Sequence, residues 1–211
     1  MAHANERERL AAMALAEPLR DDPFYAAIAI DFEADEAARR AVLTAYCRYS
    51  LREGHHIGAV IILNDDPHGA AIWNLPQPHD VAEQAMQAKH TAFAALLGPR
   101  GFDHYRAILA FMEPSAQAVI PARSWYLSIL GVAPHRQGQG LGRALLEPTL
   151  RHADQRGSRC FLETFSRAAL SFYRRFGFSE VAEHWEPTTG ARYWIMLRKP
   201  QFNEDSPHAV D

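Results

Sequence analysis

The chain has 211 residues, 48% of them hydrophobic, and its 22 basic and 25 acidic side chains leave a formal net charge of −3. A chain of this length and composition can bury one substantial core, so we expect a single domain over residues 1–200 and a polar tail over 201–211. The slightly acidic balance gives no reason to expect a nucleic-acid partner.

The first part of the chain has the pattern of two helices followed by a hairpin. Periodic apolar positions predict helices over residues 6–19 and 35–52. The period then changes to that of strands, because two apolar runs, 57–63 and 70–75, flank the turn residues 64–69.

The rest of the chain alternates helices and strands. A helix that begins at Asp80 is expected to end before Gly98 and Pro99. The predicted elements, in chain order, are a helix over 80–97, a shorter helix over 102–112, a loop over 113–123, a strand over 125–132, a helix over 141–155, a strand over 158–164, a helix over 168–176 and strands near 178–185 and 193–198. This order is typical of an α/β fold.

The most informative stretch joins the strand at 125–132 to the helix at 141–155. Three alternating glycines, Gly138, Gly140 and Gly142, open that helix. Glycines allow successive backbone N–H groups to point inward, and a helix N-terminus adds partial positive charge. The turn is therefore predicted to hold a pyrophosphate.

Three ligand classes use such a turn, and its neighbours separate them. A P-loop needs Lys and Ser or Thr after its last glycine, whereas Arg143 and Ala144 stand there. A dinucleotide fingerprint needs a third glycine where Arg143 stands, although Glu163, about 20 residues on, fits its acidic ribose ligand. Only about 70 residues follow the turn, which is too few for the remaining strands and substrate domain of a dinucleotide-binding enzyme. That class of enzyme is therefore kept only as an alternative.

The third class is acyl-coenzyme A, and the residues around the turn resemble the GNAT N-acetyltransferases. Gln-Gly-Gln-Gly-Leu-Gly at 137–142 matches the signature Gln/Arg-x-x-Gly-x-Gly/Ala of that superfamily. Leu-Gly-Val-Ala-Pro at 130–134 resembles the strand and bulge before it. Phe-Leu-Glu-Thr at 161–164 and Phe-Tyr-Arg-Arg-Phe-Gly-Phe at 172–178 resemble the second half of the fold.

The resemblance runs from the second predicted helix to Lys199. It implies a mixed central β-sheet flanked by helices, in which a splayed pair of strands with a β-bulge holds acyl-CoA. The family usually opens with a short strand, and residues 1–8 carry no strand pattern. Either the sheet lacks its first strand or the chain starts downstream of the true one.

Within the superfamily the pattern is most similar to that of the puromycin N-acetyltransferases. Four segments carry this likeness, and they cover 71–76, 125–127, 161–164 and 198–200. It implies that the acceptor is the primary amine of a small molecule, an antibiotic among the candidates. A protein or peptide N-terminus as acceptor, and an acyl-CoA-binding module without catalysis, remain alternatives.

The resemblance also implies the donor and its contacts. Acetyl-CoA is the expected acyl donor. Its pantetheine arm is expected to form hydrogen bonds along the strand at 130–132, as an added strand would. A backbone N–H of the bulge is expected to polarise the thioester carbonyl. Ser166 stands where many family members have an Asn. The expected coenzyme contacts are Leu130, Gly131, Val132, Gln137, Gly138, Gln139, Gly140, Leu141, Gly142, Arg143, Ala144, Ser166 and Tyr173.

Two residues are the expected catalysts. Tyr173 matches the tyrosine that many family members place beside the coenzyme sulfur as general acid, and a phenol stays protonated near pH 7. Glu163 is charged on an otherwise apolar strand, so it is either the general base or a buried structural carboxylate.

The acceptor side is expected to involve Trp73, Tyr126 and Ser128. Tyr126 stands where the histone-acetylating branch carries a catalytic Glu, which favours a role in the substrate wall or a water relay. Trp73 is either part of that wall or part of the core.

No metal, membrane or oxidising environment is expected. His55 and His56 are adjacent in a segment predicted as extended, so their side chains point apart, and Cys47 and Cys160 have no metal-binding spacing. No apolar run approaches the ~20 residues of a membrane span. We therefore expect a cytoplasmic monomer or homodimer.

Overall fold

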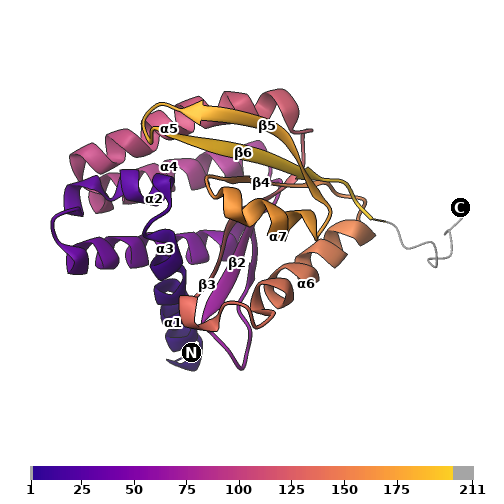
Figure 1. The fold of residues 1–211 in the computed structure, drawn as a ribbon, viewed down its shortest axis with the longest axis horizontal. Helices are drawn as coiled ribbons and strands as arrows, with labels where there is room; N and C mark the ends of the chain where they lie inside the picture. Colours follow the sequence, from indigo (N-terminus) through magenta and orange to yellow (C-terminus); the bar gives the residue numbers. More distant parts are fainter. Residues whose placement is uncertain (1, 202–211) are drawn as a thin grey trace, which may run out of the picture.

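The computed structural model describes residues 2–201, which form a six-stranded sheet with helices on both faces (Figure 1). The strand order is β1-β2-β3-β4-β6-β5. β3 and β4 run parallel, and the other neighbouring pairs run antiparallel. The predicted mixed α/β sheet is confirmed. The strands are β1 (Gly58–Ile61), β2 (Gly69–Asn74), β3 (Trp125–Val132), β4 (Cys160–Thr164), β5 (Phe178–Glu186) and β6 (Ala191–Arg198).

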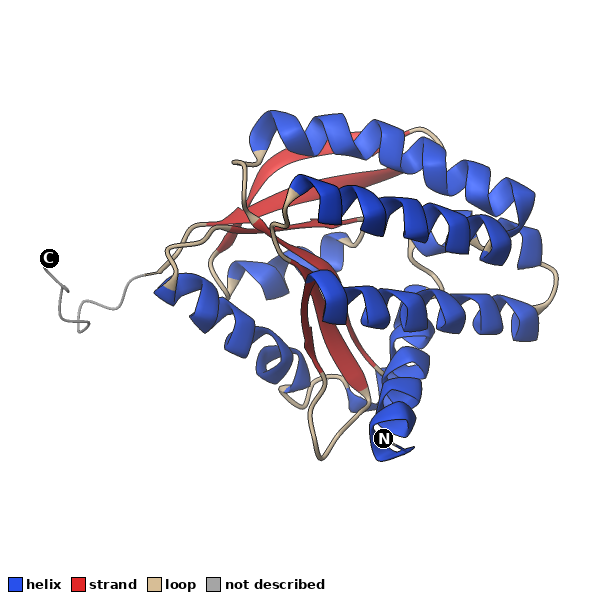
Figure 2. Ribbon diagram, turned by 180° about the vertical axis from the view of Figure 1, so that it is seen from behind, coloured by secondary structure: helices blue, strands red, loops and turns tan. Residues whose placement is uncertain are grey.

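The helices form two groups. Figure 2 shows the long helices α3, α4 and α5 stacked on one side of the sheet, and α6 and α7 lie on the other side (Figure 1). None of the helices described is long and apolar enough to cross a membrane. The helices are α1 (Ala2–Leu19), α2 (Pro23–Ile28), α3 (Glu36–Ile57), α4 (His79–Leu96), α5 (Gly98–Val119), α6 (Leu141–Gln155) and α7 (Leu170–Arg174).

Each face of the sheet has its own apolar core, because side chains alternate along a strand. Ile72 of β2 and Ile195 of β6 pack in one core with residues of α1, α3 and α5. Trp73 and Met196, one position along each strand, pack in the other core with residues of α6. We call these the α3 face and the α6 face of the sheet.

A β-bulge interrupts the alternation in β3. Ile72 of β2 pairs with Ile129, and the next residue, Trp73, pairs with Leu127, which leaves Ser128 without a partner in the ladder. Leu127 and Ile129 consequently lie in opposite cores. The predicted bulge at 130–132 is wrong in position, because these residues pair regularly with β2.

Three local predictions are also wrong. α3 continues to Ile57, so His55 and His56 lie in its last turn and not in an extended segment. In this last part of the helix Gly54 faces β1 and β2 so closely that an added Cβ would lie 2.8 Å from both Val60 and Ile72. The predicted loop at 113–123 is largely helical, because the buried positions of α5 keep their helical spacing through Met112.

The chain's ends bear on two further predictions. The first element of the described residues 2–201 is α1, so both alternatives for the family's first strand stay open. α1 packs directly on the sheet, with Leu15 against the backbone of Gly131. Of the predicted tail, Gln201 donates its backbone N–H to Asp154 at 2.8 Å, and residues 202–211 lie outside the described part of the chain.

Candidate active site

β3 and β4 separate soon after they begin. Trp125 pairs with Cys160 and Tyr126 with Phe161, and the described ladder between these strands contains no further pair. The rings of Tyr126 and Phe161 stack at the point of separation, with centroids 4.7 Å apart. The predicted splayed pair of strands is therefore present.

The glycine turn between β3 and α6 presents free backbone donors. Gly138 and Gly140 have φ angles of 75° and 81°, and a Cβ added at either would meet no atom within 4 Å. Their conformation therefore requires glycine, whereas packing does not. The N–H groups of residues 138–143 find no hydrogen-bond acceptor within residues 2–201. Such a turn at a helix N-terminus suits a phosphate group.

One cavity of about 1120 Å³ joins the turn to the splayed strands and passes through the sheet. Its lining includes Phe172 and Tyr173, which pack on the α6 face, and Tyr46 and Tyr105, which belong to the core of the α3 face. A molecule in the gap between β3 and β4 could thus touch both faces.

The charges along this cavity are segregated. Arg136, Arg143 and Arg175 line it near the glycine turn. Asp21, Asp22 and Glu163 line it away from the turn, together with Lys89, whose charge is paired with Glu53. One end is therefore suited to an anion and the other to an ammonium group.

Glu163 of β4 is half-buried beside Tyr126. Its Oε1 atom is buried and has no hydrogen-bond partner in the described chain. Burial raises the pKa of Glu163 to about 7, and a hydrogen bond from the Tyr126 hydroxyl opposes part of that rise. A carboxyl group that titrates near pH 7 and has one oxygen free is suited to accept a proton.

Tyr173 lies in α7, between aromatic neighbours. Its ring packs edge-on against Phe172 and Phe178, with centroids 5.3 and 6.0 Å away. Burial, with a smaller contribution from the Asp22 carboxylate, raises the pKa of Tyr173 above its ordinary value. The phenol is consequently protonated at neutral pH and can donate a proton.

Sequence reasoning missed Asp22 and the short helix that it caps. Asp22 Oδ1 accepts the backbone N–H of Phe24 at 2.9 Å at the start of α2. Burial raises the pKa of Asp22 to about 6, against the effect of its backbone hydrogen bonds. Asp22 followed by Pro23 is the usual start of a helix, and this signal could have revealed α2.

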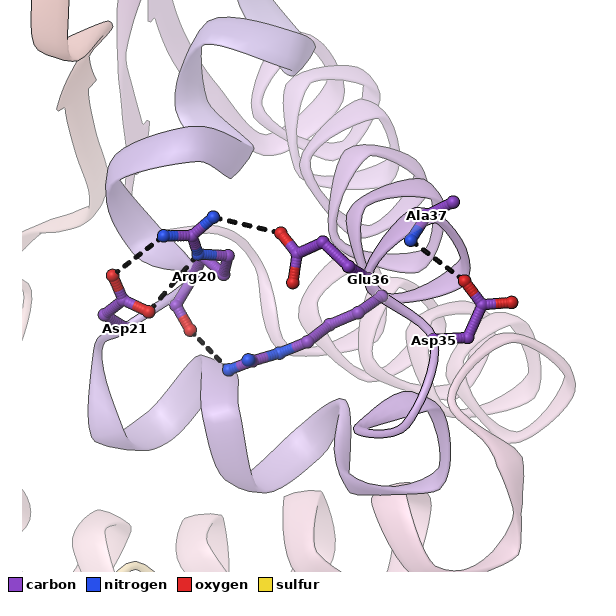
Figure 3. Close-up of polar contacts among 6 residues, drawn as sticks. Arg20, Asp21, Asp35, Glu36 and Ala37 are labelled. Carbon is purple, nitrogen blue, oxygen red and sulfur yellow. Dashed lines mark hydrogen bonds and ion pairs between the residues drawn. The ribbon is translucent and has the colours of Figure 1, made fainter.

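A polar cluster fixes the corner that carries Asp22 (Figure 3). The Arg20 guanidinium donates to Asp21 at 3.3 Å and to Glu36 at 3.0 Å. Arg39 donates to the backbone oxygen of Arg20 at 2.6 Å. These contacts join the end of α1 to the start of α3, so α2 is held over the cavity.

The cavity brings most of the predicted site residues together. Trp73, Gln139 and Ala144 do not line it, and Trp73 is fully buried in the core of the α6 face. The substrate-wall alternative for Trp73 is thus wrong, because its position on β2 points toward α6. Those that do line the cavity are Tyr126, Ser128, Leu130, Gly131, Val132, Gln137, Gly138, Gly140, Leu141, Gly142, Arg143, Glu163, Ser166 and Tyr173.

Two predicted coenzyme contacts already have partners in this structure. Arg143 donates to Glu147 at 2.9 Å, one turn along α6. The Ser166 hydroxyl accepts the N–H of Ala169 at 3.3 Å. Within residues 2–201 no group of three or more His, Cys, Asp or Glu side chains is arranged to hold a metal.

Comparison with known proteins finds a similar segment in the second half of the chain. Residues 104–180 match the sequence model of the acetyltransferase (GNAT) domain, and this segment contains β3, the glycine turn, α6, β4 and α7. The uncharacterized N-acetyltransferase C550.08 of Schizosaccharomyces pombe is 33% identical over 79 residues, which are 37% of this chain. The match spans 32% of that protein's length.

Solved structures share the whole fold. A histone acetyltransferase HPA2 and related acetyltransferase from Corynebacterium glutamicum has a TM-score of 0.61 at 18% identity, covering 92% of this chain and 91% of that one. Arylalkylamine N-acetyltransferase 2 from Aedes aegypti has a TM-score of 0.61 at 14% identity, covering 94% and 96%. At these identities the likeness shows the fold alone. The family model thus matches the segment 104–180, and the solved structures share the fold of the chain around it.

Proposed function

We propose that the protein transfers the acetyl group of acetyl-CoA to the primary amine of a small molecule. The observation that carries this proposal is the single cavity through the splayed strands, with free N–H groups and arginines at one end and carboxylates at the other. These two ends match the charges of the two substrates.

The residues around the glycine turn are proposed to bind the donor. The N–H groups of residues 138–143 donate to its pyrophosphate, and Arg136 and Arg143 add positive charge. The pantetheine arm lies against the edge of β3 beyond Tyr126, where β4 has separated and leaves that edge unpaired. Ser128, the bulged residue, supplies the free backbone N–H nearest the thioester.

Glu163 and Tyr173 are proposed to move the two protons of the reaction. Glu163 takes a proton from the substrate ammonium, and the neutral amine then forms a bond to the thioester carbonyl carbon. The carbon–sulfur bond breaks, the thiolate receives the phenolic proton of Tyr173, and the second proton of the attacking nitrogen passes to the Tyr173 phenolate, which restores the phenol. The raised pKa of Glu163 suits a base at neutral pH, whereas the raised pKa of Tyr173 keeps the phenol protonated until the thiolate is held beside it.

The acceptor end of the cavity supports an organic amine. Tyr25, Tyr46 and Tyr105 line it and are all buried, which provides an aromatic surface for an apolar or cationic group. The likeness to puromycin N-acetyltransferases makes an aromatic antibiotic amine a natural first compound to assay. Peptide N-termini form the alternative acceptor class.

A screen of amines with a free-thiol readout tests the proposal. The panel holds puromycin, arylalkylamines, alkylamines and short peptides with free N-termini, each with acetyl-CoA. We expect thiol release with at least one small amine and none without an acceptor. Tight acetyl-CoA binding without thiol release for any amine would show a binding module instead. Tight NAD(P) binding would favour the dinucleotide alternative.

A further inference from the structure

A second cavity, of about 860 Å³, lies between α4 and α5 beside the first. Four residues line both cavities: Asn74 of β2, Lys89 of α4, and Tyr105 and Leu109 of α5. The two cavities therefore adjoin at these side chains. The proposed transfer reaction uses the first cavity and leaves the second without a role.

Two buried oxygen atoms near the junction lack partners. Asn74 pairs with Tyr126 across β2 and β3, and Tyr126 pairs with Phe161 of β4, two residues before Glu163. Asn74, Tyr126 and Glu163 thus lie on the α3 face, with Glu163 two residues along β4 from the last pair of the ladder. Asn74 Oδ1 and Glu163 Oε1 are both buried without a hydrogen bond in the described chain. Unpaired buried oxygens are costly, so their presence on one face points to a ligand that donates hydrogen bonds.

An ion pair fixes the wall at the junction. Lys89 of α4 pairs with Glu53 of α3, and their side chains are 21% and 8% exposed. The pair ties α4 to α3 and neutralises the positive charge that Lys89 would otherwise place at the passage. The wall between the two cavities therefore presents no unpaired cation to an apolar group.

The second cavity is lined mainly by small or apolar side chains. They include Ile57, Leu75, Pro76, Ala85, Met86 and Ala110. Met86 is 54% exposed, an unusual position for a large apolar side chain on a helix surface. Asp103, Arg106 and Glu113 are the exposed charged groups of the lining. An apolar hollow of this kind suits a hydrocarbon or aromatic body better than a sugar or a peptide backbone.

We propose that the second cavity binds the apolar body of the acceptor, whose amine lies between Asn74 and Glu163. The acceptors are then primary amines with an elongated apolar body that passes the junction and reaches between α4 and α5. This inference rests on the proposed function for the position of the amine. It adds a binding site and a substrate class that the transfer reaction alone does not require.

A series of linear alkylamines from butylamine to decylamine tests the second cavity. In the wild-type chain we expect kcat/KM to rise with length, by up to about fourfold for each methylene group that enters the cavity. Ala85→Trp fills the cavity from α4, because Ala85 is half-buried in its lining. In this variant we expect butylamine to be unaffected and the rise with chain length to disappear.

Ala88→Trp is the matched control, since Ala88 is exposed on the same helix and lines neither cavity. It should keep the wild-type dependence on chain length. A wild-type kcat/KM that does not depend on length would overturn the inference. An equal loss for butylamine and decylamine in Ala85→Trp would overturn it too.

Calorimetric binding separates this inference from the proposed function. If no amine releases CoA, the proposed function is wrong, yet decylamine can still be titrated into the acetyl-CoA-loaded protein. Tighter binding of decylamine than of butylamine, present in the wild type and Ala88→Trp and lost in Ala85→Trp, supports the second cavity. Equal binding of both amines by all three proteins contradicts it.

Discussion

Glu163 is the residue at which stability and the proposed chemistry conflict. Burial raises the pKa of its carboxyl group from 4.5 to about 7, so the folded chain binds this proton more tightly than the unfolded chain. The stability that this group contributes is therefore fully present below about pH 4.5 and is lost as the pH rises through 7.

The variant Glu163→Gln should separate the two effects. At pH 8 we expect its free energy of unfolding to exceed that of the wild type, by up to about 3 kcal/mol, because no buried charge remains. Near pH 4.5 the two should be equal. Urea unfolding at both pH values measures this, with the exposed Glu113→Gln as control. An advantage that does not depend on pH would contradict the assigned pKa shift.

The same variant tests the base. In the wild type kcat/KM should rise with pH through an acidic limb near 7, because only the ionised carboxylate accepts the ammonium proton. In Glu163→Gln we expect lower activity without that limb. If the limb remains at the same pH, another group is the base, and Asp22, whose pKa burial raises to about 6, is the next to replace.

Tyr173→Phe removes the proposed general acid and retains its aromatic packing. The ring contacts with Phe172 and Phe178 do not involve the hydroxyl group, so acetyl-CoA affinity should change little. We expect kcat to fall on the order of 100-fold. Steady-state kinetics together with calorimetric titration of acetyl-CoA measures both quantities. Unchanged turnover would remove Tyr173 from the mechanism.

Single residues were predictable from sequence where local pattern alone marks them. Glu163 stood out because a charge interrupts an apolar strand, and Tyr173 because its neighbours resemble a family motif. Asn74 gave no such signal, since its buried, unpartnered oxygen depends on β3 and α5, which are distant in the chain. The place of Trp73, in the core or in the substrate wall, was ambiguous because the pattern of a strand does not tell which helices cover each face of the sheet.

At the scale of elements, periodicity predicted the strands well and the pairing poorly. Nothing in the sequence of β3 distinguishes a bulge at Ser128 from one at 130–132, because a bulge exists only in the register with β2. Helix ends were missed for a related reason. α3 extends to Ile57, and its Gly54 lies too close to β1 and β2 for a side chain, an approach between segments that the local pattern does not reveal.

The glycines of the turn should differ in what they do. Gly140 has a positive φ and open space around it, so Gly140→Ala strains the loop by roughly 1–2 kcal/mol without a clash. We expect a tenfold or greater loss of acetyl-CoA affinity by calorimetry, with S-acetylpantetheine, which lacks the pyrophosphate, bound as before.

Gly142→Ala is the matched comparison in the same turn. Its Cβ would lie 3.1 Å from Phe172 Cζ, so we expect a lower free energy of unfolding. Any loss of affinity should be the same for acetyl-CoA, which carries the pyrophosphate, and for S-acetylpantetheine, which does not. If both variants weaken acetyl-CoA and S-acetylpantetheine equally, the turn does not bind the pyrophosphate.

At the scale of the whole molecule, the sheet consists of two halves that meet at one end. β1, β2 and β3 form one half, and β4, β6 and β5 the other, joined through two residue pairs of β3 and β4. The order of strands and helices indicated the fold class. The cavity between the halves could not be predicted, because it arises where two strands fail to pair.

A ligand that spans this gap should stabilise both sides of it. At 100 times its Kd, acetyl-CoA should add about 2.7 kcal/mol to the free energy of unfolding, or roughly 5–10 °C in Tm for a chain of this size. Hydrogen exchange shows which segments the bound ligand stabilises. We expect acetyl-CoA to slow exchange in residues 127–132, the free edge of β3, and in 138–143 of the turn, whereas ADP should slow exchange in 138–143 alone. Protection of both segments by ADP would contradict the position proposed for the pantetheine arm, because ADP carries the pyrophosphate and has no arm to lie along β3.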